Sequence, residues 1–130
     1  MDLVEFLRAR LAKDEQIARA CSGASWTASP SGTVHLDPAG GGEPSGSGFV
    51  ASVENGAYAE FIARYDPDRA LQEVAARRRI VDDYEKGAWV LEQGQRTEAA
   101  EAAHAARLAV LRLLALPYAH HPEYRQEWRP

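Results

Sequence analysis

The chain has 130 residues and a formal net charge of −4, from 19 acidic and 15 basic side chains. This length suits a single domain over residues 1–130, and the acidic excess gives no electrostatic reason to expect a nucleic-acid partner. The longest uncharged apolar run, 113–119, is far below the roughly 20 residues that cross a bilayer. Asp2 and Glu5 interrupt the apolar N-terminus, unlike a signal peptide. One cysteine, Cys21, cannot form an internal disulfide, so we expect a cytoplasmic protein with no membrane contact.

Two regions of different composition open the chain. Apolar residues three or four apart predict an amphipathic helix over 2–20, with Asp2 as its N-cap and Leu3, Phe6, Leu7, Leu11 and Ile17 on one face. In residues 22–56, by contrast, Gly, Ser, Pro and Thr supply 20 of the 35 positions. Alternation over 33–37 and 49–54 predicts a small antiparallel β-hairpin or meander of two or three strands, with Trp26 opening the first strand and the Gly-rich stretch 38–48 as a turn. The expected contacts between this sheet and the helices are Trp26, Val34 and Phe49.

Residues 57–116 predict three helices, over 57–65, 67–93 and 98–116. Pro67 suits a first helical position, Gly94 a left-handed C-terminal cap and Thr97 an N-cap. The apolar seam of the long helix is expected to be Leu71, Val74, Val81, Tyr84, Ala88 and Leu91, widened by Ile80 and Trp89. The seam of the last helix is expected to be His104, Leu108, Leu111 and Ala115, joined by Val110 and Leu114.

The long helix is too long for a compact domain of this size. About 27 residues span about 40 Å, whereas a 130-residue domain is roughly 36 Å across. We therefore expect either a break near Gly87 or a projecting antiparallel helical hairpin. Exposed apolar seams on such a hairpin would favour a homodimer.

The last segment, 117–130, is rich in aromatic and imidazole side chains. Pro122 can start a short helical turn that aligns Tyr124 with Trp128. We expect these rings to cover an edge of the core and to hold the fold together. The whole chain is therefore predicted to be an α+β protein that is mostly α.

The residues that could carry chemistry do not form recognisable motifs. Cys21, His35, His104, His120 and His121 lack the short spacing of zinc ligands, and nothing around the cysteine marks a nucleophile. A phosphate-binding loop needs a basic residue to reach the phosphates, and the Gly-rich stretch holds no Lys or Arg. We expect no cofactor and no catalytic residue.

Arg77, Arg78 and Arg79 form the one dense basic patch. Consecutive helical residues point about 100° apart, so the three cannot make a single stripe. Each has a carboxylate four residues away, which indicates a solvated, ion-paired face; the expected pairs are Glu73–Arg77, Arg78–Asp82 and Arg79–Asp83. A possible interaction surface comprises Arg77, Arg78, Arg79, Trp89, His120 and His121.

Three stretches resemble a family of short actinobacterial and actinophage proteins that carries a domain-of-unknown-function label. They are the opening 2–11 with 14–20, the segment 59–67 leading to 76–81, and the ending 113–130, which reads LLALPYAHHPEYRQEWRP. The chain departs from that pattern at Tyr65, where a His is usual, and at His120, where an Asp is usual. The resemblance implies a lineage and an architecture, and no activity.

These observations favour a non-enzymatic protein-binding or accessory module with a protein partner that the sequence does not identify. The alternative is a small nucleic-acid-associated regulator that uses Arg77, Arg78, Arg79 and Arg96. A metal-dependent enzyme is the third hypothesis.

Overall fold

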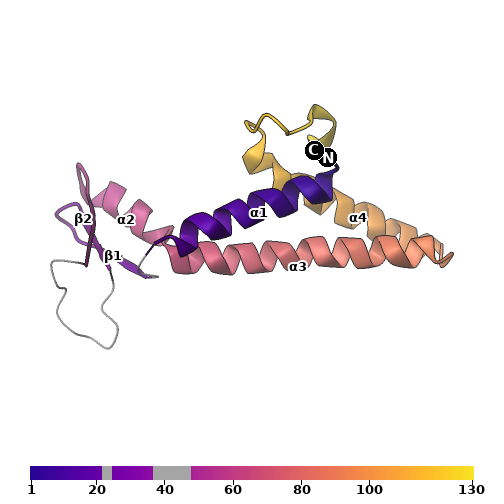
Figure 1. Cartoon of the computed structure of the whole chain (residues 1–130), viewed down its shortest axis with the longest axis horizontal. Coiled ribbons are helices and arrows are strands. Elements are labelled where there is room, and N and C mark those ends of the chain that lie inside the picture. The colour runs from indigo at the N-terminus through magenta and orange to yellow at the C-terminus, as the bar shows by residue number, and fades with distance from the viewer. Residues whose placement is uncertain (22–24, 37–47) are drawn as a thin grey trace. The chain divides into compact units, whose positions relative to one another are not determined.

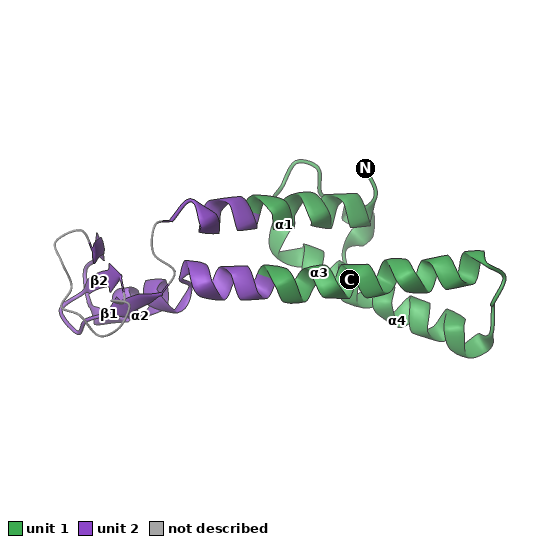
Figure 2. Cartoon of the chain, turned by 60° about the horizontal axis from the view of Figure 1, so that its bottom comes forward, with its two compact units in different colours: residues 1–13, 74–130 green, residues 14–73 purple. Residues whose placement is uncertain are grey.

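The computed structural model describes residues 1–21, 25–36 and 48–130, and the chain forms two compact units (Figure 2). One unit comprises residues 1–13 and 74–130, and the other comprises residues 14–73. The elements, in chain order, are α1 (Leu3–Arg19), β1 (Trp26–Ala28), β2 (Thr33–Leu36), β3 (Phe49–Ser52), α2 (Gly56–Arg64), α3 (Pro67–Glu92), α4 (Glu98–Ala115) and the 3₁₀ turns η2 (Leu116–Tyr118) and η3 (Gln126–Trp128) (Figure 1). The predicted α+β class, mostly α, is confirmed. The predicted turn over 38–48 lies almost wholly outside the described residues.

Helices α1 and α4 have the N-terminal caps that the sequence predicted. The Glu5 backbone N–H donates to Oδ1 of Asp2 at 2.8 Å, and the Asp2 N–H donates back to Oε2 of Glu5 at 2.9 Å. This reciprocal pair satisfies two N–H groups of the first turn. Thr97 caps α4 by accepting from the Ala100 N–H at 3.0 Å, and Gly94 has φ +86° where the long helix ends. The helix is unbroken at Gly87, so the alternative of a break there is wrong.

The unit of residues 14–73 holds the sheet and α2. The strands are antiparallel in the order β1-β2-β3, which confirms a meander that begins at Trp26. Asn55 caps α2 through bonds from the Ala57 and Tyr58 N–H groups. Asp66 joins the sheet to the start of α3, because its two carboxylate oxygens accept from the backbone N–H groups of Trp26 (3.2 Å) and Arg69 (2.9 Å).

Gly32 turns the chain between β1 and β2 with φ +94°, and the Val53 carbonyl oxygen lies 2.5 Å from where a Cβ would stand. At Gly94, with nearly the same φ, nothing lies within 4 Å of that position. A left-handed backbone conformation costs an L-residue roughly 1–2 kcal/mol. Only Gly32 would add a collision with backbone atoms.

We therefore expect Gly32→Ala to lower the free energy of unfolding by about 2 kcal/mol or more, and Gly94→Ala by only about 1 kcal/mol. Urea unfolding of the two variants beside the parent chain, followed by far-ultraviolet circular dichroism, measures this difference. Equal losses would mean that the close approach of Val53 does not constrain the turn.

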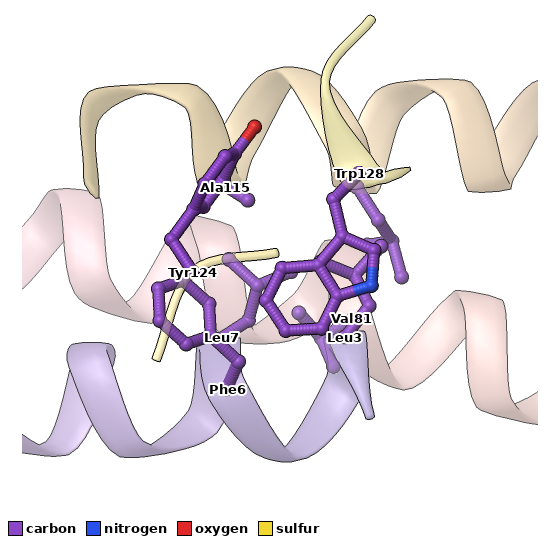
Figure 3. Close-up of a cluster of buried hydrophobic side chains, with 8 residues drawn as sticks. Leu3, Phe6, Leu7, Val81, Ala115, Tyr124 and Trp128 are labelled. Carbon is purple, nitrogen blue, oxygen red and sulfur yellow. The ribbon is translucent and has the colours of Figure 1, made fainter. Parts of the chain in front are cut away.

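The core of the other unit is a cluster of side chains from α1, α3, α4 and the C-terminal segment (Figure 3). Phe6 is fully buried, and its ring centroid lies 5.1 Å from that of Trp128 and 5.9 Å from that of Tyr124. The predicted packing of the C-terminal aromatics on the core is thus confirmed. The cluster consists of Leu3, Phe6, Leu7, Val81, Leu111, Ala115, Tyr124 and Trp128.

Next to this core, Arg8 forms an ion-paired bridge to α3. Its guanidinium donates to Asp82 and to Glu85, each at 2.8 Å. Hydrogen bonds to Asp82 and then to Glu85 raise the pKa of Arg8. Asp82 therefore accepts a hydrogen bond from Arg8 of α1, whereas the sequence predicted only an ion pair with Arg78. Asp83 is exposed, and among the described residues no ion pair joins it to Arg79, contrary to the prediction.

Four side chains that were expected to pack inward are exposed instead. Phe49 (54% exposed) pairs with His35, which points to the opposite face of the sheet from the buried Val34. Ile17 (56% exposed) lies off the helical seam, because the 3.6-residue period that runs through Leu11 continues to the buried Ala18. Trp89 (61% exposed) and Val110 (39% exposed) each lie about 100° around their helix from an inward-facing neighbour.

Candidate protein-binding surfaces

Helix α2 presents its large side chains to solvent. Tyr58, Phe61 and Tyr65 follow the i, i+3, i+7 spacing of one helix face, and they are 54%, 66% and 53% exposed. The Phe61 and Tyr65 ring centroids lie 5.0 Å apart, and the Arg69 guanidinium carbon lies 4.5 Å from the Tyr65 centroid. We call these four residues the aromatic face.

The side chain that α2 buries completely is small. Ala59 is the buried residue of this helix, at 0% exposure, and it faces the unit interior. A helix that serves only to cover a core usually points its larger apolar side chains inward. In α2 the covered side holds Ala59 and the half-buried Ile62, whereas the larger rings of Tyr58 and Phe61, and of Tyr65 at the C-cap, point outward.

An open groove of about 660 Å³ runs between β1 and another side of α2. Trp26, Ser29 and Pro30 form one wall, and Glu60 and Arg64, an exposed ion pair with 3.4 Å between N and O, form the other. Strand β1 is only three residues long, and Pro30 lies in the turn that follows it, a combination that protects an edge strand from pairing. The groove therefore offers a partner little backbone to pair with.

Helix α4 has two apolar faces. One packs on the core through Leu111 and Ala115. The other is exposed along the helix and contains no charged residue. This outer face of α4 consists of Ala102, Ala105, Ala106, Ala109, Val110, Leu113 and the helical C-cap residue Leu116.

The six residues predicted as an interaction surface differ in exposure. Arg79, Trp89 and His120 are exposed, whereas Arg77 and Arg78 are half-buried, and neither of these two arginines is free of interactions. Arg96, the other arginine of the nucleic-acid alternative, pairs with Glu101 at 3.3 Å.

His121 belongs to the core edge rather than to an open surface. Its ring stands edge-on to Phe6, with 5.7 Å between centroids, and its Nε2 contacts the Arg10 guanidinium. Its Nδ1 accepts the Glu123 N–H at 3.1 Å. Both ring nitrogens are thus engaged with neighbouring groups.

Three of the side chains weighed as metal ligands or catalysts have local partners of their own. His104 stacks on Tyr84 with 4.8 Å between ring centroids, His35 lies against Phe49, and the Cys21 thiol donates to the Ile17 carbonyl oxygen. Within residues 1–21, 25–36 and 48–130, no three His, Cys, Asp or Glu side chains are grouped so that they could hold a metal ion. Nor does any helix in that part of the chain have the length and apolarity to span a membrane.

Sequence reasoning missed both the aromatic face and the outer face of α4, although each left a signal. The spacing of Tyr58, Phe61 and Tyr65 is visible in the sequence, but without the position of the sheet nothing says which side of α2 is covered. In α4 the apolar residues exceed what one seam can hold, which marks a helix that is apolar on two sides.

The chain matches the model of a family of unknown function (DUF6221) over residues 1–130, and it belongs to that family. No curated protein and no solved structure matches it.

Proposed function

We propose that this member of DUF6221 is a non-enzymatic protein-binding module and that its partner docks on the aromatic face of α2. The observation that carries the proposal is the exposure of three neighbouring rings, Tyr58 and Phe61 on α2 and Tyr65 at its C-cap. Tyr, Phe and Arg are enriched where proteins meet, and aromatic side chains dominate the binding energy of such contacts.

The aromatic face also has the form of an interface centre. The Phe61 ring packs at a tilt against the Tyr65 ring, and the Arg69 guanidinium lies over the Tyr65 ring. Arg69 is itself held by Glu73 at 3.0 Å, and this hydrogen bond is the main cause that raises the pKa of Arg69. The rings are thus partly ordered before a partner arrives, which lowers the entropy lost on binding.

Charged pairs border the rings. Glu60 and Arg64 form an exposed ion pair next to Phe61 in sequence, and Arg69 and Glu73 form another after Tyr65. An apolar centre with a polar rim is typical of transient interfaces. We place the protein in the cytoplasm because its single cysteine is free and exposed. The arginine-rich, lysine-poor composition supports an origin in a high-GC actinobacterium or its phage.

The test is affinity capture from the source organism with the parent chain, with Phe61→Ala/Tyr65→Ala and with Trp89→Ala as the matched control. Trp89 is an equally exposed aromatic residue on α3, outside the aromatic face. We expect a bound protein that the double variant loses and the control retains. With purified components, the double variant should bind at least about 30-fold more weakly, the size of one hot-spot contact.

Both variants should unfold at nearly the parental urea concentration, because exposed side chains contribute little to stability. Equal capture by the parent chain and the Phe61→Ala/Tyr65→Ala variant would contradict the proposal. A large loss of stability in that variant would show instead that the rings serve the fold.

A further inference from the structure

The outer face of α4 belongs to the unit of residues 1–13 and 74–130, whereas the aromatic face belongs to the unit of residues 14–73, and the outer face of α4 has no role in the proposed function. Its seven residues follow the i, i+3, i+4, i+7 pattern of a packing surface from Ala102 to Leu116, about 21 Å of helix. Leu113 is 56% exposed, and Val110 and Leu116 are each 39% exposed. Isolated exposed leucines are common on proteins, but a continuous apolar face usually marks a contact.

The side chains of this face become larger from the N-terminal to the C-terminal end of the helix. Its N-terminal half carries only methyl groups, from Ala102, Ala105, Ala106 and Ala109. Its C-terminal half carries the larger Val110, Leu113 and Leu116. Such a surface fits a second copy that runs antiparallel to it, because the small side chains of one helix then face the large side chains of the other.

We propose that two copies of this chain pair antiparallel through the outer face of α4, with Ala109 at the two-fold axis. In this register Ala102 lies opposite Leu116 of the partner subunit, and Ala105 lies opposite Leu113 of the partner subunit. A parallel pair would place leucine against leucine at one end and leave the alanine halves apart. Two-fold dimers of this self-complementary kind are the commonest oligomers.

The charges at the two ends of α4 agree with the antiparallel register. Its first turn carries Glu98 and Glu101, and its last turn carries Arg112. Antiparallel pairing brings the acidic end of each helix toward the basic end of the other. It also places the positive end of each helix dipole beside the negative end of the other, whereas a parallel pair would place two positive ends and two negative ends together.

The number of side chains sets the strength of the dimer. A stable interface of standard size uses about 20–30 residues on each side. The outer face of α4 offers seven residues, and all of them have uncharged apolar side chains. We therefore expect a reversible dimer with a dissociation constant in the micromolar range, on the order of 10–100 μM.

The experiment is sedimentation velocity of the full chain from about 1 to 500 μM. The parent chain should move from monomer to dimer across this range, and Leu113→Glu should stay monomeric because each dimer would bury two unpaired carboxylates. Ala76→Glu, an exposed substitution on α3, should dimerise like the parent chain. Circular dichroism of all variants confirms that they fold.

A charge-pair variant tests the direction of pairing. In the antiparallel dimer, Ala105→Lys/Leu113→Glu places each lysine opposite a glutamate of the partner subunit and should restore at least part of the dimer that Leu113→Glu loses. In a parallel dimer, like charges would meet and association would stay lost. A parent chain that is monomeric at every concentration overturns the proposal, and a dimer insensitive to Leu113→Glu overturns the assigned face.

Discussion

Replacing Trp128 with alanine will lower the free energy of unfolding by about 3–5 kcal/mol, the usual cost of removing a packed aromatic ring. Trp128 is 6% exposed, and its ring packs edge-on to Tyr124 with 5.7 Å between centroids. A tryptophan can bury up to about 250 Å². Because a domain of this size has roughly 5–15 kcal/mol of total stability, a large part of it rests on this ring near the end of the chain.

Trp89→Ala is the matched control, since it removes the same ring from a site that is 61% exposed. Its effect should stay within about 0.5 kcal/mol. Urea unfolding curves of both variants beside the parent chain give the comparison. If Trp128→Ala unfolds at the parental midpoint, the C-terminal segment is a recognition element and not part of the core.

Phe6→Ala will be as damaging, with an expected loss of about 3–5 kcal/mol. The Phe6 ring is fully buried and stands at the centre of the aromatic cluster, with Tyr118, His121, Tyr124 and Trp128 around it. This one residue of α1 therefore connects the beginning of the chain to its end.

The double variant Phe6→Ala/Trp128→Ala tests that connection. The ring centroids lie 5.1 Å apart, so the second truncation removes contacts that the first has already weakened. The combined loss should fall short of the sum of the two single losses by about 0.5–3 kcal/mol. Additive losses would mean that the two rings support separate parts of the unit. If the double variant is too unstable to measure, Phe6→Leu with Trp128→Phe gives the same cycle at smaller cost.

The helices could be predicted from the sequence because their signals are local. Asp2 and Thr97 cap by bonding to N–H groups within three residues, and Gly94 supplies a conformation that other residues avoid. The alternation around Val34 predicted the strands in the same way. The ending around Trp128 was predictable because its two large rings are spaced to lie on one side of a short turn.

The surfaces could not be predicted, because exposure depends on what packs against each element. Phe61 and Ala59 are both apolar, and only the position of the sheet against α2 decides that the alanine is buried. In α4, Val110 and Leu114 both looked like seam residues, and the core accepts Leu114 alone. The bridge from Arg8 to Asp82 joins residues 74 positions apart and leaves no trace in local spacing.

A short crosslink at Ala109 tests the self-pairing of α4 most directly. In a Cys21→Ser background, Ala109→Cys places one thiol at the two-fold axis, where two Cα atoms can come within the roughly 4.4–6.8 Å that a disulfide spans. We expect a covalent dimer under mild oxidation, formed faster than with Ala76→Cys, and a crosslinked chain that keeps the parental circular dichroism spectrum. Equal, slow crosslinking of Ala109→Cys and Ala76→Cys would show only random collision and would contradict the antiparallel dimer.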